Sequence, residues 1–133
     1  MYRHILVGLD GRRGDRTILD HVAELARAHG SRVTLIRVGE AHPWDAIVGE
    51  GEKIEAYLAQ ARDDLAQRGI AADTVTAHGD PADTILEQAE ALECDLIAMS
   101  THGHRWLADL LFGSVAEAVR HRAKMPVLLL RGE

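Results

Sequence analysis

Short apolar runs alternate with segments of helical spacing along the whole chain. Five runs of apolar or β-branched residues, each bounded by Gly, Asp or Pro, predict strands at residues 5–9, 33–36, 74–76, 96–99 and 127–130. The intervals between them carry apolar residues every three or four positions, which predicts a helix in each. Gly30 and Gly69 are expected to end the first two helices, and Asp80 with Pro81 to open the third. Strict alternation of this kind predicts an α/β fold, with one open, mostly parallel sheet and helices on both faces.

Size and composition narrow this picture to one domain. A chain of 133 residues with 47% hydrophobic residues can bury a single core, so residues 1–133 are expected to form one domain. The formal net charge is −6 and no run of like charges occurs, which argues against nucleic acid or an anionic membrane as a partner. No apolar run approaches the length of a membrane span and no signal segment is recognisable, so we expect a cytoplasmic protein. Cys94 lies between two acidic residues and is expected to be a packing residue.

The candidate chemistry lies after the first and fourth predicted strands. Ligands of open parallel sheets bind beyond the carboxyl ends of the strands, where the strand order reverses. Asp10 follows the first strand, and its carboxylate can accept two hydrogen bonds from a ribose diol. Gly103 and the pair Gly113-Ser114 offer backbone N–H groups, which suit a phosphate. An acceptor and a donor-rich segment together predict a nucleotide site.

At these residues the chain resembles the universal stress proteins over its whole length. The nucleotide-binding branch of that family carries Gly, two residues, Gly, nine residues, and then Gly followed by Ser or Thr. Gly103, Gly113 and Ser114 match this pattern, whereas Ser100 stands where its first glycine belongs. The resemblance implies a five-stranded sheet of order 3-2-1-4-5, and a homodimer that pairs through the last strand.

The resemblance also implies a set of ligand contacts. Asp10 matches the acidic residue after the first strand, and Val38 matches a backbone position that faces adenine. ATP is the expected ligand, with Mg²⁺ bound through its phosphates. His104 and Arg105 are either phosphate-neutralising groups or solvated loop residues. The complete predicted contact set is Gly8, Asp10, Val38, Met99, Ser100, Gly103, His104, Arg105, Gly113, Ser114 and Val115.

Ser100 is the one departure from the family pattern. A Cβ and a hydroxyl at this position are expected to crowd the ribose and the first phosphate. Ser100→Gly is therefore predicted to tighten ATP binding by about 1 kcal/mol, or roughly fivefold.

A binding module is favoured over an enzyme. Neither a P-loop string nor G-x-G-x-x-G occurs, and Ser114 has no histidine or lysine in its helical turn to act as a base. The eight histidines show no spacing typical of a protein-only metal site, so none is predicted. Three functions stay open: an ATP-binding stress-response or regulatory module, a weak ATPase, and a nucleotide-free dimeric interaction protein. No client protein is indicated by the sequence.

Overall fold

A five-stranded parallel sheet forms the centre of the molecule. The computed structural model describes residues 1–39, 50–102 and 115–132. The strands lie in the order β3-β2-β1-β4-β5, and every neighbouring pair is parallel. This order and the α/β class confirm the prediction from the sequence. The strands are β1 (His4–Leu9), β2 (Arg32–Gly39), β3 (Ala72–His78), β4 (Leu96–His102) and β5 (Val127–Gly132).

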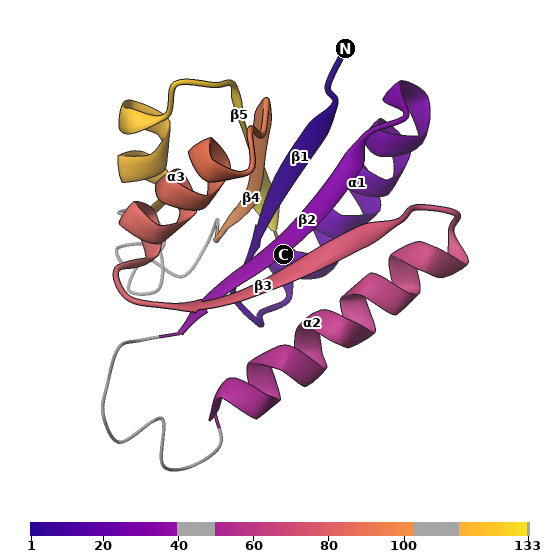
Figure 1. Cartoon of the computed structure of the whole chain (residues 1–133), viewed down its shortest axis with the longest axis horizontal. Coiled ribbons are helices and arrows are strands. Elements are labelled where there is room, and N and C mark those ends of the chain that lie inside the picture. Colours follow the sequence, from indigo (N-terminus) through magenta and orange to yellow (C-terminus); the bar gives the residue numbers. More distant parts are fainter. Residues whose placement is uncertain (40–49, 103–114, 133) are drawn as a thin grey trace.

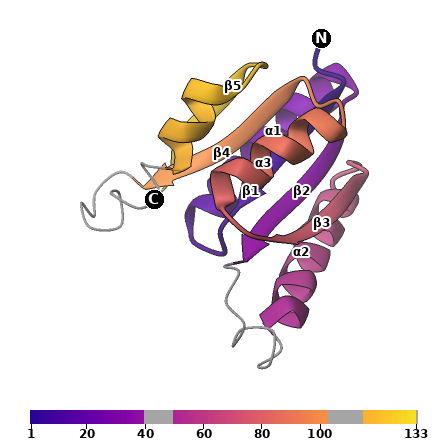
Figure 2. The same cartoon turned by 60° about the vertical axis from the view of Figure 1, so that its left-hand side comes forward.

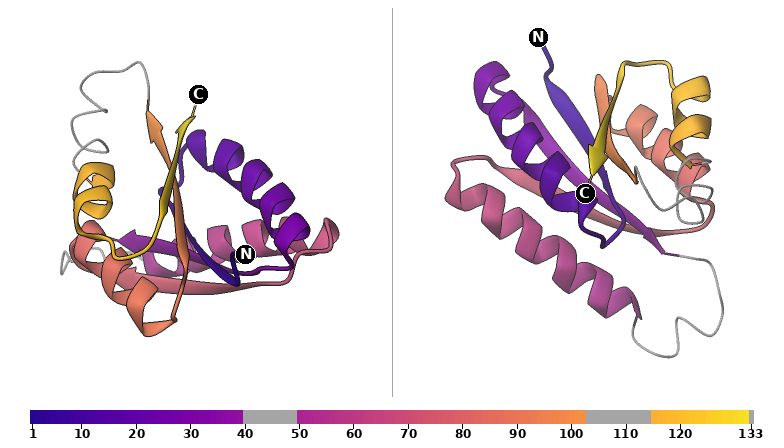
Figure 3. Two further views of the ribbon diagram at one scale, coloured as in Figure 1. Left: turned by 90° about the horizontal axis from the view of Figure 1, so that it is seen from above. Right: turned by 180° about the vertical axis from the view of Figure 1, so that it is seen from behind.

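Helices cover both faces of the sheet, as predicted. α1 (Gly14–His29) and α2 (Glu50–Gln67) pack on one face, and α3 (Pro81–Ala91) packs on the other together with helical residues 115–122 (Figures 1 and 2). The left view of Figure 3 shows α1 and α3 on opposite sides of the sheet. No helix in the described part of the chain is long and apolar enough to cross a membrane.

The central strands bury side chains on both faces, which explains their almost continuous apolar runs. In β1, Ile5 and Val7 belong to the core under α1 and α2, whereas Leu6 belongs to the core under α3. All three side chains are fully buried. Cys94 is buried in the α3 core, where burial raises its thiol pKa to about 11, in keeping with a packing role.

The predicted helix boundaries are confirmed at three points. Gly30 ends α1 in the left-handed conformation, with φ of 66°. Gly69, with φ of 82°, follows the end of α2. Asp80 caps α3, because its side chain accepts a hydrogen bond of 2.9 Å from the backbone N–H of Asp83, and Pro81 is the first helical residue.

The strands are longer than the apolar runs that predicted them. β3 was expected over 74–76 and spans Ala72–His78, and β4 was expected over 96–99 and spans Leu96–His102. The added residues are paired: Ala72 lies opposite Val33, and Ser100 lies opposite Leu130. Backbone pairing does not require an apolar side chain, so a hydrophobic pattern underestimates strand length where the ends are polar.

Candidate functional site

A cavity of about 500 Å³ opens at the carboxyl ends of β1, β2 and β4. β1 is the strand from which the chain runs outward in both directions, first to β2 and β3 and later to β4 and β5. The cavity therefore lies at the switch point of the sheet, where open parallel sheets bind their ligands. Its volume is within the range of small-molecule sites, which is about 300–1,000 Å³.

Six of the eleven predicted contact residues line this cavity, and they come from separate segments of the chain. The remaining five, Gly103, His104, Arg105, Gly113 and Ser114, lie outside the described residues. A binding role for any of the eleven stays a prediction. The six that line the cavity are Gly8, Asp10, Val38, Met99, Ser100 and Val115.

The floor of the cavity is apolar and is kept open by a glycine. A Cβ added at Gly8 would lie 3.4 Å from Met99 Cγ and 3.6 Å from Ile85 Cδ1. Any longer side chain at this position would fill the cavity above these two residues. The apolar lining also includes Ile36 and Ile54, which sequence reasoning did not assign to the site. A flat aromatic group, such as a nucleobase, suits a floor of this kind.

The loop between β1 and α1 forms the polar wall. Asp10 Oδ1 accepts a hydrogen bond of 2.9 Å from the backbone N–H of Arg12, which closes a tight turn. Gly11 has φ of 81°, and a Cβ there would lie 2.7 Å from Arg37 Nη2. The positive φ favours glycine at this position, whereas the end of the flexible Arg37 side chain can move away from an added Cβ. Arg12 and Arg37 also line the cavity and were not predicted, although each lies within two residues of a predicted contact.

The buried carboxylate of Asp15 holds the loop between β1 and α1 through hydrogen bonds to its backbone. Asp15 is 2% exposed, and its Oδ1 accepts a hydrogen bond of 3.1 Å from the Asp10 N–H. Its Oδ2 accepts hydrogen bonds from the Gly11 N–H at 2.8 Å and from the Tyr57 hydroxyl at 2.5 Å. Arg37 in turn places its guanidinium carbon 5.0 Å from the centre of the Tyr57 ring.

Burial dominates the ionisation of this network. It raises the pKa of Asp15 from its ordinary 3.8 to about 6, although the hydrogen bonds from Tyr57 and the loop amides act in the opposite direction. Burial and the adjacent Asp15 carboxylate raise the pKa of Tyr57, so its hydroxyl stays protonated and donates. Sequence reasoning missed Asp15. Its position in the first turn of a helix, five residues after Asp10, was the available signal.

Ser100, the one departure from the family pattern, lies beside two glycines. Its side chain packs between the start of α1 and the end of β5, because a Cβ built on Gly14 would lie 2.9 Å from Ser100 Cβ and closer still to its hydroxyl oxygen. A Cβ on Gly132 would lie 3.4 Å from Ser100 Cβ. Ser100 also borders the cavity. Crowding of the nucleotide by Ser100 therefore stays a prediction, while the absence of a Cβ at Gly14 and Gly132 leaves room for the Ser100 side chain.

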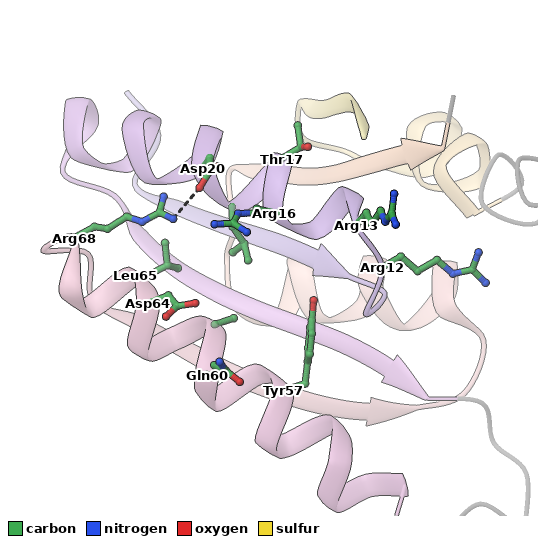
Figure 4. Close-up of a pocket in the computed structure, with 12 residues that line it drawn as sticks. Arg12, Arg13, Arg16, Thr17, Asp20, Tyr57, Gln60, Asp64, Leu65 and Arg68 are labelled. Carbon is green, nitrogen blue, oxygen red and sulfur yellow. Dashed lines mark ion pairs between the residues drawn. The ribbon is translucent and has the colours of Figure 1, made fainter. Parts of the chain in front are cut away.

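A second groove, of about 740 Å³, lies between α1 and α2 (Figure 4). Arg12, Arg13, Arg16 and Arg68 are among its lining residues, and Arg68 pairs with Asp20 at 2.7 Å. In Figure 4, Arg12 and Arg13 extend outward from the start of α1, away from Arg68 at the other end of the groove. The arginines are exposed and do not converge on one point, so we centre the candidate site on the cavity at the switch point.

The sheet order and the position of the cavity define an open α/β domain with a crevice at its switch point. The model of the universal stress protein family matches residues 1–131, and the chain belongs to this family. A universal stress protein of Bacillus subtilis is 28% identical over 148 aligned positions, which cover 98% of this chain and 100% of the relative. The universal stress protein A homolog 1 of Coxiella burnetii is 33% identical, with 96% of this chain and 94% of the relative covered.

Solved structures share the fold. A universal stress family protein from Burkholderia pseudomallei superposes with a TM-score of 0.82 at 27% identity, covering 98% of this chain and 97% of its own. A universal stress protein in complex with cAMP gives a TM-score of 0.81 at 24% identity, with 99% of each chain covered. The universal stress protein from Archaeoglobus fulgidus in complex with dAMP gives 0.74 at 24% identity, with 98% of each chain covered.

Proposed function

We propose that this protein binds an adenine nucleotide in the crevice at the switch point, and that ATP with Mg²⁺ is its ligand. The observation that carries the proposal is the convergence of Gly8, Asp10, Val38, Met99 and Ser100 on one cavity. These residues come from three strand ends and one loop, and the apolar floor adjoins a polar wall that includes the Asp10 carboxylate.

Each part of a nucleotide has a matching surface in this arrangement. The base packs on the apolar floor beside Val38 and Met99, and the ribose hydroxyls donate to Asp10. The phosphates are assigned to the backbone N–H groups of Gly103, Gly113 and Ser114, as the sequence predicts; these residues lie outside the described part of the chain. Mg²⁺ enters the proposal as the ion that accompanies the phosphates of ATP.

The related structures support an adenine nucleotide as the class of ligand. Two proteins of the same fold are in complex with cAMP and with dAMP. The two ligands, cAMP and dAMP, each contain adenine and one phosphate, whereas their sugars and phosphate linkages differ. The adenine part is therefore the portion of the ligand that we infer most directly. Comparing the affinities for ATP, AMP and cAMP decides how many phosphates the ligand carries.

We propose that the protein has a regulatory or stress-response role that depends on binding its ligand, and we assign it no reaction. None of the crevice residues that the structure describes pairs a nucleophile with a base, and the proposal therefore includes no catalytic step. A weak ATPase and a nucleotide-free interaction protein are the competing functions. We propose cytoplasmic location and a homodimer that pairs through β5, an edge strand without lysine.

Isothermal titration calorimetry tests the proposal. ATP with Mg²⁺, AMP and cAMP are titrated separately, and micromolar binding of at least one is expected, on the order of −8 kcal/mol. Asp10→Asn should weaken that binding, because an amide accepts fewer hydrogen bonds from the ribose. Asp73→Asn is the matched control, since Asp73 lies on β3 away from the crevice, in an exposed ion pair with Arg32. Absence of binding up to millimolar nucleotide would favour the interaction protein.

A further inference from the structure

Asp15 joins three segments of the chain around a single buried carboxylate. Asp15 lies in the first turn of α1. Its carboxylate oxygens accept hydrogen bonds from the backbone N–H groups of Asp10 and Gly11 and from the hydroxyl of Tyr57 in α2. Figure 4 shows the Tyr57 side chain extending from α2 toward the start of α1. Asp15 does not line the crevice, and it is not one of the predicted contact residues.

The two amides that Asp15 binds belong to the loop that carries the polar wall of the crevice. Asp10 is the carboxylate placed for the ribose, and Gly11 keeps a left-handed backbone beneath Arg37. The backbone N–H of Asp10 is fixed from below, while its side chain is fixed by the N–H of Arg12. The direction of the Asp10 carboxylate is therefore set by hydrogen bonds on both sides.

The position of Asp15 requires a hydrogen-bond acceptor. A buried carboxylate is costly, and well-packed apolar residues commonly replace buried ionic groups without loss of stability. An apolar side chain at Asp15, however, would leave the Asp10 and Gly11 amides without their acceptor. The network thus exchanges stability for a defined loop conformation.

We propose that Asp15 is a positioning residue for the crevice: it holds the Asp10 loop in its ligand-binding conformation and, through Tyr57, ties that loop to α2. This inference rests on the proposed function, because it assigns Asp15 a role in the binding of the same nucleotide. Tyr57 takes part as the donor that aligns the Asp15 carboxylate, and Arg37 packs against the Tyr57 ring.

The test compares Asp15 with another buried hydrogen bond, which joins His4 of β1 to Thr34 of β2. His4 Nε2 and Thr34 Oγ1 lie 2.7 Å apart, and both residues are buried at 6% and 2% exposure. Thr34→Val removes that hydrogen bond, and neither His4 nor Thr34 lines the crevice. Asp15→Asn keeps the size of the side chain and one acceptor oxygen, and Tyr57→Phe removes only the tie to α2.

Two readouts are needed, namely the affinity for fluorescent mant-ATP with Mg²⁺ and the amide hydrogen exchange of Asp10 and Gly11 without nucleotide. Asp15→Asn should weaken mant-ATP binding roughly tenfold, as expected for loss of a hydrogen bond to a charged group. It should also accelerate exchange at the two amides. Tyr57→Phe should show a smaller loss of affinity, and it serves as the test if Asp15→Asn does not fold. Thr34→Val should change neither quantity.

Unchanged affinity in Asp15→Asn, or in Tyr57→Phe where that variant is the test, would overturn the inference alone. So would an equal loss of affinity in Thr34→Val, since general destabilisation would then explain the effect. A wild-type protein that does not bind mant-ATP would overturn the proposed function, and with it the role of Asp15 in binding. Amide exchange would still report, in that case, whether Asp15 holds the loop.

Discussion

Gly14 and Ser100 form a steric pair whose energetics can be predicted from the structure. Gly14 begins α1, and it is not one of the glycines with positive φ in the described residues, so its backbone accepts an alanine. The added Cβ would nevertheless lie 2.9 Å from Ser100 Cβ, which is closer than packed carbon atoms approach. Gly14→Ala is therefore expected to be destabilising for a steric reason alone.

The magnitude follows from two opposing effects. Inserting a methyl group into a packed site costs about 1–3 kcal/mol, whereas Gly→Ala at a compatible position gains about 0.4–1 kcal/mol from the unfolded chain. Gly14→Ala should thus lower the free energy of unfolding by about 1–2 kcal/mol. In a Ser100→Gly background the next atom is Gly132 Cα, at an ordinary 3.5 Å. The same substitution should then be neutral or stabilise the protein by about 0.5 kcal/mol.

A double-mutant cycle measured by urea unfolding checks this reasoning. The expected coupling free energy between the two positions is about 2 kcal/mol. Gly51→Ala is the matched control, because Gly51 lies in α2 with no atom within 4 Å of its added Cβ. It should not be destabilising. Equal effects of Gly14→Ala in both backgrounds would refute the steric account.

Two further predictions concern pH and assembly. Because the pKa of Asp15 is raised from 3.8 to about 6, the folded protein holds a proton between these values that the unfolded chain has lost. The stability that Asp15 contributes is thus present below pH 4, and the free energy of unfolding falls by about 3 kcal/mol as the pH rises to 6. Asp15→Asn should remove this difference in the free energy of unfolding between pH 4 and pH 7, measured with urea. Pairing through β5 predicts that light scattering at tens of micromolar gives twice the mass of one chain. A monomer would rule out that interface.

The fold could be predicted from the sequence because its signals are local and repeated. Apolar runs identified every strand of the sheet, and the residues at Gly30 and Asp80 marked helix ends through their own backbone and capping chemistry. The switch-point rule then brought Asp10 and Met99 to one cavity without any knowledge of their distance. Parallel topology places these strand ends together whatever their side chains are.

The direction of side chains could not be predicted in the same way. Ser100 was identified from a motif position, yet whether its Cβ faces a ligand or α1 depends on the pleat of β4 and on Gly14, which lies 86 positions earlier in the chain. Asp15 was missed for a related reason. Its partner Tyr57 lies in α2, 42 positions further along the chain, and no local pattern encodes that contact.

An NMR titration with ATP and Mg²⁺ tests the central claim most directly, because it distinguishes binding in the crevice from binding in the groove between α1 and α2. Binding in the crevice predicts saturable amide shifts at Gly8, Asp10 and Val38, which line it. Gln60 and Asp64 line only the groove between α1 and α2, and their amides should stay unchanged. Shifts confined to that groove, or no shifts up to millimolar nucleotide, would contradict the account.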